Sequence, residues 1–278
     1  MNRLSFVASM LMMCLPMTMM AQKNGAKAQN KPDPNFQIYL CFGQSNMEGN
    51  AAIEDIDRTG VNPRFMAMYA VDDEKAGWKK GQWHTAVPPQ ARPDTGLTPV
   101  DYFGRKMVDN LPDSIKVGTI TVAVGGASID LFDKRTCKAY LKKQPDWMKN
   151  FASKYNGNPY ARLIELAKIA QKQGVIKGIL LHQGETNNGD ANWPNRVKTV
   201  YNDILKELHL KAEDVPLLVG ETVQKDHGGS CWQHIAIVDD IAKTIPTAHV
   251  ISSKGCPQRG DGLHFIAESY RTMGKRYA

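Results

Sequence analysis

The chain has 278 residues and a formal net charge of +7, with 42% hydrophobic and 23% charged residues, a composition typical of a globular protein with a large core. Its lysines are dispersed, and no basic cluster is longer than the pairs at 79–80 and 142–143. Aromatic residues are not interleaved with these lysines in any nucleic-acid-binding motif. The charge therefore predicts a solvated surface and no nucleic-acid partner.

The N-terminus has the pattern of a secretory signal. Arg3 gives it a basic start, an uncharged run follows at 4–20, and a small residue ends the run. The run is at the lower limit for a membrane span, and no basic stop-transfer segment follows, so we expect no stable membrane insertion. Residues 1–21 are predicted to be a signal peptide that directs export to a periplasm or out of the cell. The polar residues 22–35 are predicted to be a disordered leader, and 36–278 a single domain.

Four cysteines follow the predicted signal peptide: Cys41, Cys137, Cys231 and Cys256. None of them forms a Cys-x-x-Cys pair, so no zinc site is expected. Export permits disulfides, and four cysteines allow three pairings. We expect Cys231 to pair with Cys256, because both fall in predicted loops near the C-terminus, and Cys41 to be a buried free thiol.

The domain alternates strand-like and helix-like segments. Short apolar runs predict strands at 36–42, 115–124, 175–181, 215–219 and 249–252. Apolar residues at helical spacing predict helices at 99–111, 159–173, 193–208 and 235–245. This alternation predicts a three-layer α/β/α sandwich with a mainly parallel sheet of about five strands. In such folds ligands bind at the carboxyl ends of the strands.

Ser45 follows the first predicted strand in the segment Gly-Gln-Ser-Asn-Met-Glu-Gly at 43–49. A serine in a tight strand-to-helix turn is exposed above the sheet, and the backbone N–H beside it can help to bind an oxyanion. This pattern makes Ser45 a candidate nucleophile, although a serine at this position also serves simply as a helix N-cap.

Asp261 and His264 supply the base that a serine nucleophile requires. A carboxylate three residues before a histidine can hold one ring nitrogen while the other nitrogen faces the serine. Two further strand ends offer donors for an oxyanion. Gly125 and Gly126 form a turn without side chains that can expose a backbone N–H, and Gln183 can direct its amide at the same point.

Together these motifs resemble the sialate O-acetylesterase and acetylxylan esterase group of the SGNH hydrolases. Gly-Gln-Ser-Asn-Met (43–47), Gly-Gly-x-Ser (125–128), Gln-Gly-Glu (183–185) and Asp-Gly-x-His-Phe (261–265) occur in the order seen in that group. The likeness covers essentially the whole domain. It implies an SGNH fold, also described as flavodoxin-like, and a serine esterase that removes acetyl groups from carbohydrate without a metal or an organic cofactor.

The resemblance also assigns roles. Ser45 would be the nucleophile, His264 the general base and acid, and Asp261 its orienting carboxylate. The Ser45 N–H, the Gly126 N–H and the Gln183 amide would form the oxyanion hole. Glu185 would brace the nucleophile loop, although a catalytic role for it stays open. His182 stands where relatives often have an aromatic residue, which leaves the contacts on the acetyl side of the pocket open.

The substrate is expected to bind across two long irregular segments, 50–98 and 132–157, which exceed common loop lengths. They contain six aromatic residues that can either stack on a sugar or pack in the core: Trp78, Trp83, Phe132, Tyr140, Trp147 and Tyr155. An acetylated xylan-type polysaccharide is favoured, and acetylated sialic acid is the second possibility. A lipid or thioester hydrolase on the same fold and a non-catalytic carbohydrate-binding protein are the alternative functions.

Overall fold

The structure, a computed structural model, describes residues 31–278. The predicted signal peptide and residues 22–30 of the predicted leader lie outside the described residues. The end of that leader is not disordered, because residues 33–36 form a turn in which the Phe36 N–H donates to the Asp33 carbonyl at 3.1 Å. The Asp33 N–H in turn donates to the carbonyl of Gln173 at 3.0 Å, which ties the turn to the domain.

Seven strands form one sheet in the order β3-β2-β4-β1-β5-β6-β7, and all neighbouring strands are parallel except β2 and β3. Their bounds are β1 Phe36–Gly43, β2 Phe65–Met68, β3 Trp83–Thr85, β4 Lys116–Ala123, β5 Val175–His182, β6 Leu217–Gly220 and β7 Ala248–Ile251. The parallel three-layer fold is confirmed. The expected strand number was too low, because β2 and β3 lie in the segment 50–98, which was predicted to be irregular.

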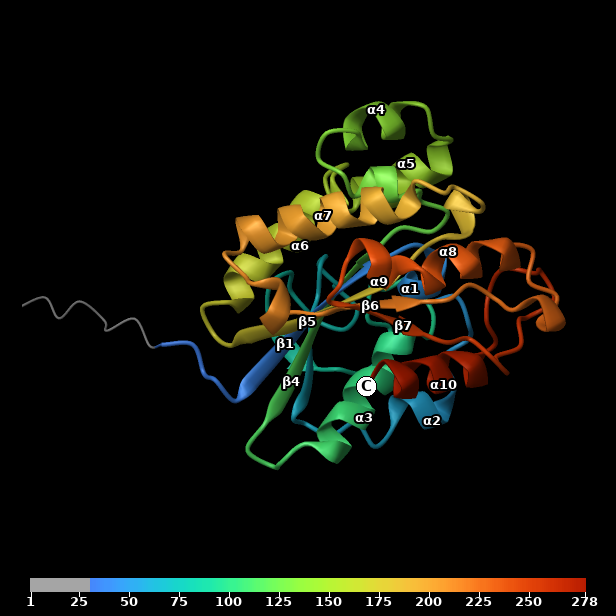
Figure 1. Ribbon diagram of the computed structural model, residues 1–278. Coiled ribbons are helices and arrows are strands. Elements are labelled where there is room, and N and C mark those ends of the chain that lie inside the picture. Colours follow the sequence, from blue (N-terminus) through green and yellow to red (C-terminus); the bar gives the residue numbers. More distant parts are fainter. Residues whose placement is uncertain (1–30) are drawn as a thin grey trace, which may run out of the picture. The chain divides into compact units, whose positions relative to one another are not determined.

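Helices cover both faces of the sheet, as Figure 1 shows. One face carries α4 Cys137–Lys142, α5 Asp146–Ser153, α6 Pro159–Ala170, α7 Trp193–Glu207, α8 Ile235–Asp239 and α9 Ile241–Thr244, and the other carries α2 Asp55–Arg58, α3 Pro99–Asn110 and α10 Ala267–Tyr277. The helix predicted at 235–245 is therefore two short helices, and the segment 132–157 contains α4 and α5.

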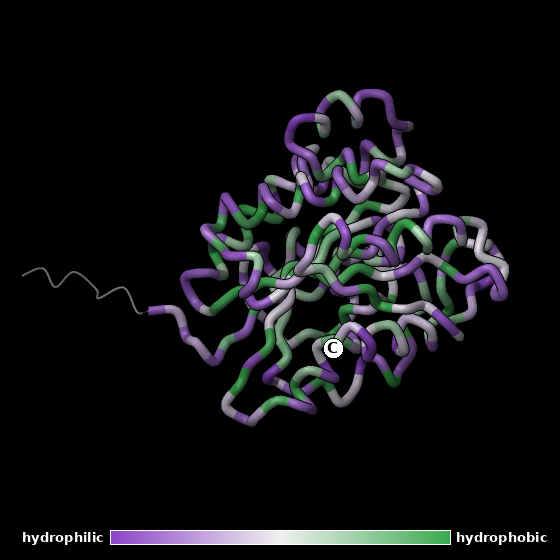
Figure 2. Tube along the Cα trace, in the orientation of Figure 1, coloured by the Kyte–Doolittle hydropathy of each residue, from purple (hydrophilic) through white to green (hydrophobic). Residues whose placement is uncertain are grey.

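Side chains of β1 alternate between two hydrophobic cores. Leu40 and Phe42 pack in the core beneath α6 and α7, whereas Tyr39 and Cys41 pack in the core beneath α3 and α10. Burial on both faces explains why this strand is a continuous apolar run in the sequence. In Figure 2 the hydrophobic colour accordingly follows the central strands, while the outer turns are hydrophilic.

The strand order brings the candidate residues together. β4, β1 and β5 are neighbours, so the loops after their carboxyl ends meet at one edge of the sheet. Gly43 makes the turn out of β1 with φ of +152°, and a Cβ at this position would lie 2.1 Å from the carbonyl oxygen of His182. Only glycine fits this close approach. The short helix α1, Ser45–Glu48, begins two residues later.

No helix in residues 31–278 combines the length and the apolar character that crossing a membrane requires.

Candidate active site

Ser45 is the first residue of α1, held in the turn after β1 and 7% exposed. Its Oγ lies 2.8 Å from Nε2 of His264, although 219 positions separate the two residues in the sequence. This contact is within the distance at which an imidazole can remove a hydroxyl proton. The structure thus brings together the serine and the histidine that the motifs singled out.

Asp261 contacts the other side of the imidazole. Its Oδ2 lies 2.7 Å from Nδ1 of His264, and its Oδ1 accepts the backbone N–H groups of Leu263 and His264 at 2.9 and 2.8 Å. Arg259 donates through Nε to Oδ2 at 2.8 Å. Burial acts to raise the pKa of Asp261, but these hydrogen bonds outweigh it and hold the pKa well below its usual range. The carboxylate is therefore ionised wherever the imidazole is to work as a base.

Asn46, the residue after the serine, connects the loops that carry the other groups. Its Nδ2 donates to Glu185 Oε1 at 2.5 Å and to the carbonyl of Leu263 at 2.9 Å, and its Oδ1 accepts the hydroxyl of Tyr270 at 2.7 Å. Asn46 is fully buried. Since Leu263 immediately precedes His264, this amide fixes the serine turn against the histidine loop.

Glu185 is therefore hydrogen-bonded to Asn46, whereas the imidazole of His264 is hydrogen-bonded to Asp261. Burial raises the pKa of Glu185, and the second oxygen, Oε2, is buried without a hydrogen-bond partner among residues 31–278. Burial thus disfavours the charged form of this carboxyl, whose Oε1 accepts from the residue next to the serine.

Gly125 and Gly126 differ in what their N–H groups do. The Gly125 N–H donates to Glu48 Oε1 at 3.1 Å, whereas the N–H groups of Gly126 and Ser45 have no acceptor within the described part of the chain. Gly126 has φ of +69°, a conformation that favours glycine. Ser45 and Gly126 both line the same pocket, so two free donors are available there for an oxyanion.

The pocket has a volume of about 450 Å³ and contains the serine, the histidine and the glycine turn. One wall is a buried ion pair in which Arg92 Nη1 donates to Glu48 Oε1 at 2.5 Å. The same nitrogen donates to the Ala123 carbonyl at 3.1 Å, and Nε donates to Asp94 at 3.2 Å. Burial raises the pKa of Glu48, while Arg92 and the Gly125 N–H favour its charged form. Trp147 and Phe151 of α5 also line the pocket, and the Arg92 guanidinium lies 5.0 Å from the centre of the Phe151 ring.

Residues 35–278 match the family described as carbohydrate esterase, sialic acid-specific acetylesterase. The match covers most of the chain. The chain belongs to this family of carbohydrate esterases. It is accordingly an ester hydrolase, and the resemblance found in the motifs is confirmed.

Three solved structures share the fold of this esterase. A protein from Arabidopsis thaliana is 20% identical with a TM-score of 0.64, and the alignment covers 88% of this chain and 97% of that one. NanS is 15% identical with a TM-score of 0.61, over 89% and 96% of the two chains. A carbohydrate acetylesterase from Xanthomonas citri is 20% identical with a TM-score of 0.58, over 87% of this chain and 55% of its own.

Gln183 does not lie where the sequence analysis expected it. Its side chain is fully buried behind the pocket, and Nε2 donates to Asn187 at 2.8 Å, to Gln44 at 3.1 Å and to the Ala127 carbonyl at 3.2 Å. Its Oε1 accepts the indole N–H of Trp193 at 2.5 Å. Because both amide hydrogens are engaged, the expectation that Gln183 donates to an oxyanion is not supported by this geometry. The residue instead holds the loops behind the serine.

The aromatic residues expected at the substrate are mostly elsewhere. Of the six, only Trp147 lines the pocket, where it is joined by Phe151, which the sequence analysis had not named. Tyr155 is buried beneath Arg92, and Trp83 packs on Phe36. The segment 132–157 thus contributes to the pocket through α5. From the segment 50–98 the pocket takes polar and charged side chains, Arg92 among them.

His182 is fully buried at the end of β5, between the rings of Phe265 and Tyr277, and does not line the pocket. Burial lowers its pKa to about 4. The expected disulfide between Cys231 and Cys256 is wrong, because both are free thiols. Their sulfur atoms have other neighbours: Cys231 donates to the Glu185 carbonyl at 3.5 Å, and Cys256 lies 3.5 Å from an Arg276 nitrogen.

The sequence analysis missed Arg259, Glu48 and Arg92. Arg259 stands two residues before Asp261, and this spacing was the only signal for its contact with the carboxylate. Glu48 and Arg92 are 44 positions apart, and nothing in their local sequence indicates that they form a buried pair.

Proposed function

We propose that the protein is a carbohydrate O-acetylesterase that works by two-step acyl transfer at Ser45. The supporting observation is the continuous chain from Ser45 Oγ to His264 Nε2 at 2.8 Å and from His264 Nδ1 to Asp261 at 2.7 Å, which opens into a pocket with two free N–H donors. The nucleophile, the base and its carboxylate lie at hydrogen-bonding distance from one another, and two free N–H donors line the same pocket.

In the first step Ser45 Oγ bonds to the acetyl carbonyl carbon while its proton passes to Nε2 of His264. The carbonyl oxygen becomes an oxyanion that accepts the N–H groups of Ser45 and Gly126. The bond to the sugar oxygen then breaks, and His264 returns the proton to that oxygen, so that a sugar alcohol leaves and acetyl-Ser45 remains. In the second step water attacks the acetyl group, His264 takes its proton, and acetate leaves as Oγ is protonated again.

Asp261 acts on the imidazole. Ionised and held by two backbone N–H groups and Arg259, it fixes the tautomer with the proton on Nδ1 and stabilises the imidazolium that forms in each step. Neither this chemistry nor the resemblance calls for a metal or an organic cofactor.

The charges of the pocket favour a neutral sugar next to the acetyl group. Among the described residues, Arg92 is the one arginine or lysine that lines the pocket. It is 2% exposed and already donates to Glu48, Asp94 and a carbonyl. A sugar carboxylate would find no free cation here and would lose solvation. This supports an acetylated xylan-type residue over acetylated sialic acid, whose acid group would need a partner.

We also propose that the enzyme acts outside the cytoplasm, because the basic start and the uncharged run at 4–20 fit a cleavable signal. An exported enzyme would encounter acetylated polysaccharide in that location.

The test is acetate release by purified enzyme from acetylated xylan and from O-acetylated sialic acid, together with acetyl and octanoyl nitrophenyl esters. We expect a higher kcat/KM for xylan than for sialic acid, and faster turnover of the acetyl than of the octanoyl ester. Faster octanoyl turnover would indicate a lipid hydrolase, and no release from any ester would indicate a non-catalytic carbohydrate-binding protein.

A further inference from the structure

Positive charge is concentrated in one short segment of the domain. Residues 31–278 contain 32 Lys and Arg against 28 Asp and Glu, whereas residues 133–154 alone contain seven Lys and Arg against two Asp. The excess positive charge of the described chain thus lies in this segment, which forms α4 and α5 and their connections. The sequence analysis treated the lysines as dispersed and did not single out this local excess.

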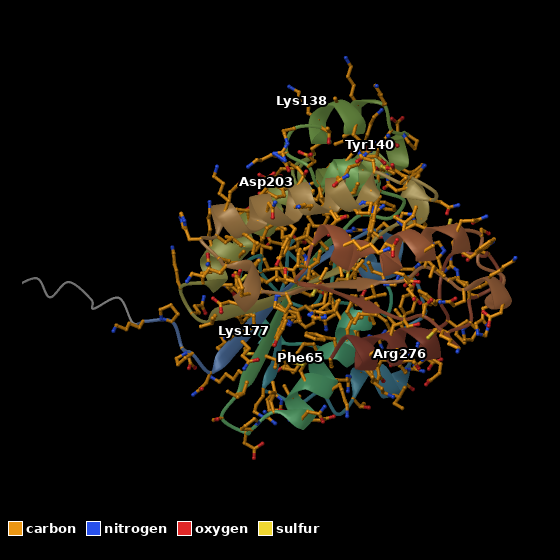
Figure 3. All side chains as sticks on the ribbon, viewed as in Figure 1. Phe65, Lys138, Tyr140, Lys177, Asp203 and Arg276 are labelled. Carbon is orange, nitrogen blue, oxygen red and sulfur yellow. The ribbon has the colours of Figure 1, made fainter. Side chains whose placement is uncertain are left out.

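Four of these lysines line a groove of about 510 Å³: Lys134, Lys138, Lys142 and Lys149. Lys134 is paired with Glu207 at 2.7 Å and Lys149 with Asp146 at 3.4 Å. Lys138 and Lys142 have no carboxylate within 4.0 Å in residues 31–278, and both are exposed. Figure 3 shows Lys138 on α4 at the outer edge of the molecule.

Lys138 and Lys142 are spaced so that their unpaired positive charges repel each other. They stand four positions apart on α4, so their ammonium groups lie on the same helix face and repel each other. An anion placed between them would relieve this repulsion. The remaining groove residues include Asn156 and Asn158, whose amides can donate hydrogen bonds to the same ligand.

The groove adjoins the catalytic pocket. Trp147 and Phe151 of α5 line the pocket, whereas Lys149 lines the groove. Residues four apart share a helix face, and the residue midway between them lies on the opposite side. α5 therefore separates the two cavities, and the distance between them is about one helix diameter, ~10 Å. A ligand that occupies both must be a chain of several units.

We propose that this groove binds the carboxylate groups of an acidic polysaccharide whose acetylated residue enters the catalytic pocket. The inference rests on the proposed function, which places a neutral acetylated sugar at Ser45. The pocket offers no free cation to a carboxylate, and the groove offers two about one helix away. The substrate class is therefore an acetylated glycan chain that carries uronic acid residues beside the acetylated one.

The test compares the double variant K138E/K142E with the wild type and with K172E/K177E. The control makes the same change of charge at two exposed lysines near the start of β5, far from the carboxyl ends of the strands, where Figure 3 labels Lys177. The substrates are acetylated glucuronoxylan, in which neutral acetylated xylose stands beside uronic acid, acetylated glucomannan, which is neutral, and acetyl nitrophenyl ester. Exposed charge pairs contribute about 0.2–1 kcal/mol each, so two lysines predict a rise in KM of about 10-fold for glucuronoxylan.

For K138E/K142E we expect unchanged kcat on the small ester and unchanged KM for glucomannan. Added salt should raise the wild-type KM for the acidic polymer and leave that of the variant nearly constant. An equal KM in variant and wild type, or an equal rise in the control, would overturn the inference.

A binding assay tests this inference independently of the proposed function. Retention on unacetylated polygalacturonate in affinity electrophoresis should be strong for the wild type and the control and weak for K138E/K142E, whether or not the enzyme releases acetate. Absence of esterase activity would reject the proposed function alone. Equal retention of all three proteins, or tighter binding to duplex DNA than to polygalacturonate, would reject the groove assignment.

Discussion

Two carboxyl groups lie near His264, and exchanging each for its amide shows which one serves the imidazole. Asp261→Asn keeps the size of the side chain and removes its charge. Its amide nitrogen can then face Nδ1, which would force the proton onto Nε2 and leave the Ser45 hydroxyl without an acceptor. Glu185→Gln keeps the Oε1 acceptor that Asn46 uses.

The kcat values of the two variants should differ by orders of magnitude. Loss of the carboxylate partner of a triad histidine lowers kcat by about 10⁴-fold, which corresponds to about 5.5 kcal/mol of transition-state stabilisation. Glu185 accepts a hydrogen bond from Asn46, whereas Asp261 is the carboxylate hydrogen-bonded to the imidazole, and burial raises the pKa of Glu185 and so disfavours its charged form. For Glu185→Gln we expect a loss of kcat of less than about 10-fold, since uncharged hydrogen bonds contribute about 1 kcal/mol.

The assay is steady-state hydrolysis of acetyl nitrophenyl ester, with circular dichroism and urea unfolding as controls for folding. The reasoning predicts a severe loss of kcat for Asp261→Asn with little change in KM, and a near-normal Glu185→Gln. If Glu185→Gln lost far more activity than Asp261→Asn while both remained folded, Glu185 would be the acid of the triad and the assignment of Asp261 would be rejected.

Three further substitutions probe the surroundings of the triad. Asn46→Ala should lower the free energy of urea unfolding by about 3 kcal/mol, because it leaves several buried polar groups unpaired. It should also cut kcat about 100-fold by displacing Ser45. A normal kcat in a destabilised variant would refute the role of Asn46 in positioning the serine. Gly126→Ala should lower esterase activity in the same assay, since a φ of +69° disfavours a side chain and a Cβ would lie 2.7 Å from the Trp147 ring; activity equal to the wild type would show that catalysis does not depend on the geometry of this glycine turn. His182 has a pKa of about 4 in the fold and 6.5 as its ordinary value, so the unfolded chain binds its proton first as the pH falls. The contribution of His182 to the free energy of unfolding is complete above about pH 6.5 and declines by about 3 kcal/mol between pH 6.5 and 4. His182→Phe should therefore unfold less readily than the wild type in urea titrations at acidic pH. An unchanged acid dependence of stability would contradict this.

Much of the fold was accessible from the sequence, because the central strands are buried on both faces and are therefore continuous apolar runs. β1 and β5 are found within one or two residues of their predicted bounds. β2 and β3 were missed because they have four and three residues, too few to show a period of two, and lie in a segment rich in proline and glycine. Pairing with β4 stabilises β2, and such a long-range contact leaves no local signal.

The candidate site likewise contains residues that the sequence revealed and residues that it did not. Ser45 and the Asp261–His264 pair were found because each lies in a local motif, and strand order explains how they meet. Gln183 was expected at the oxyanion, but its amide points into the loops behind the serine, a direction that only tertiary hydrogen bonds determine. The contact of Arg92 with Glu48 was missed for the same reason.

The most direct test of the central claim is the activity of Ser45→Ala on acetyl nitrophenyl ester and on acetylated xylan. The account predicts that kcat/KM falls by at least about 10⁴-fold on both substrates, because the attacking oxygen is lost, while circular dichroism and the urea midpoint stay close to those of the wild type. A folded Ser45→Ala protein that released acetate within 10-fold of the wild-type rate would contradict acyl transfer to Ser45.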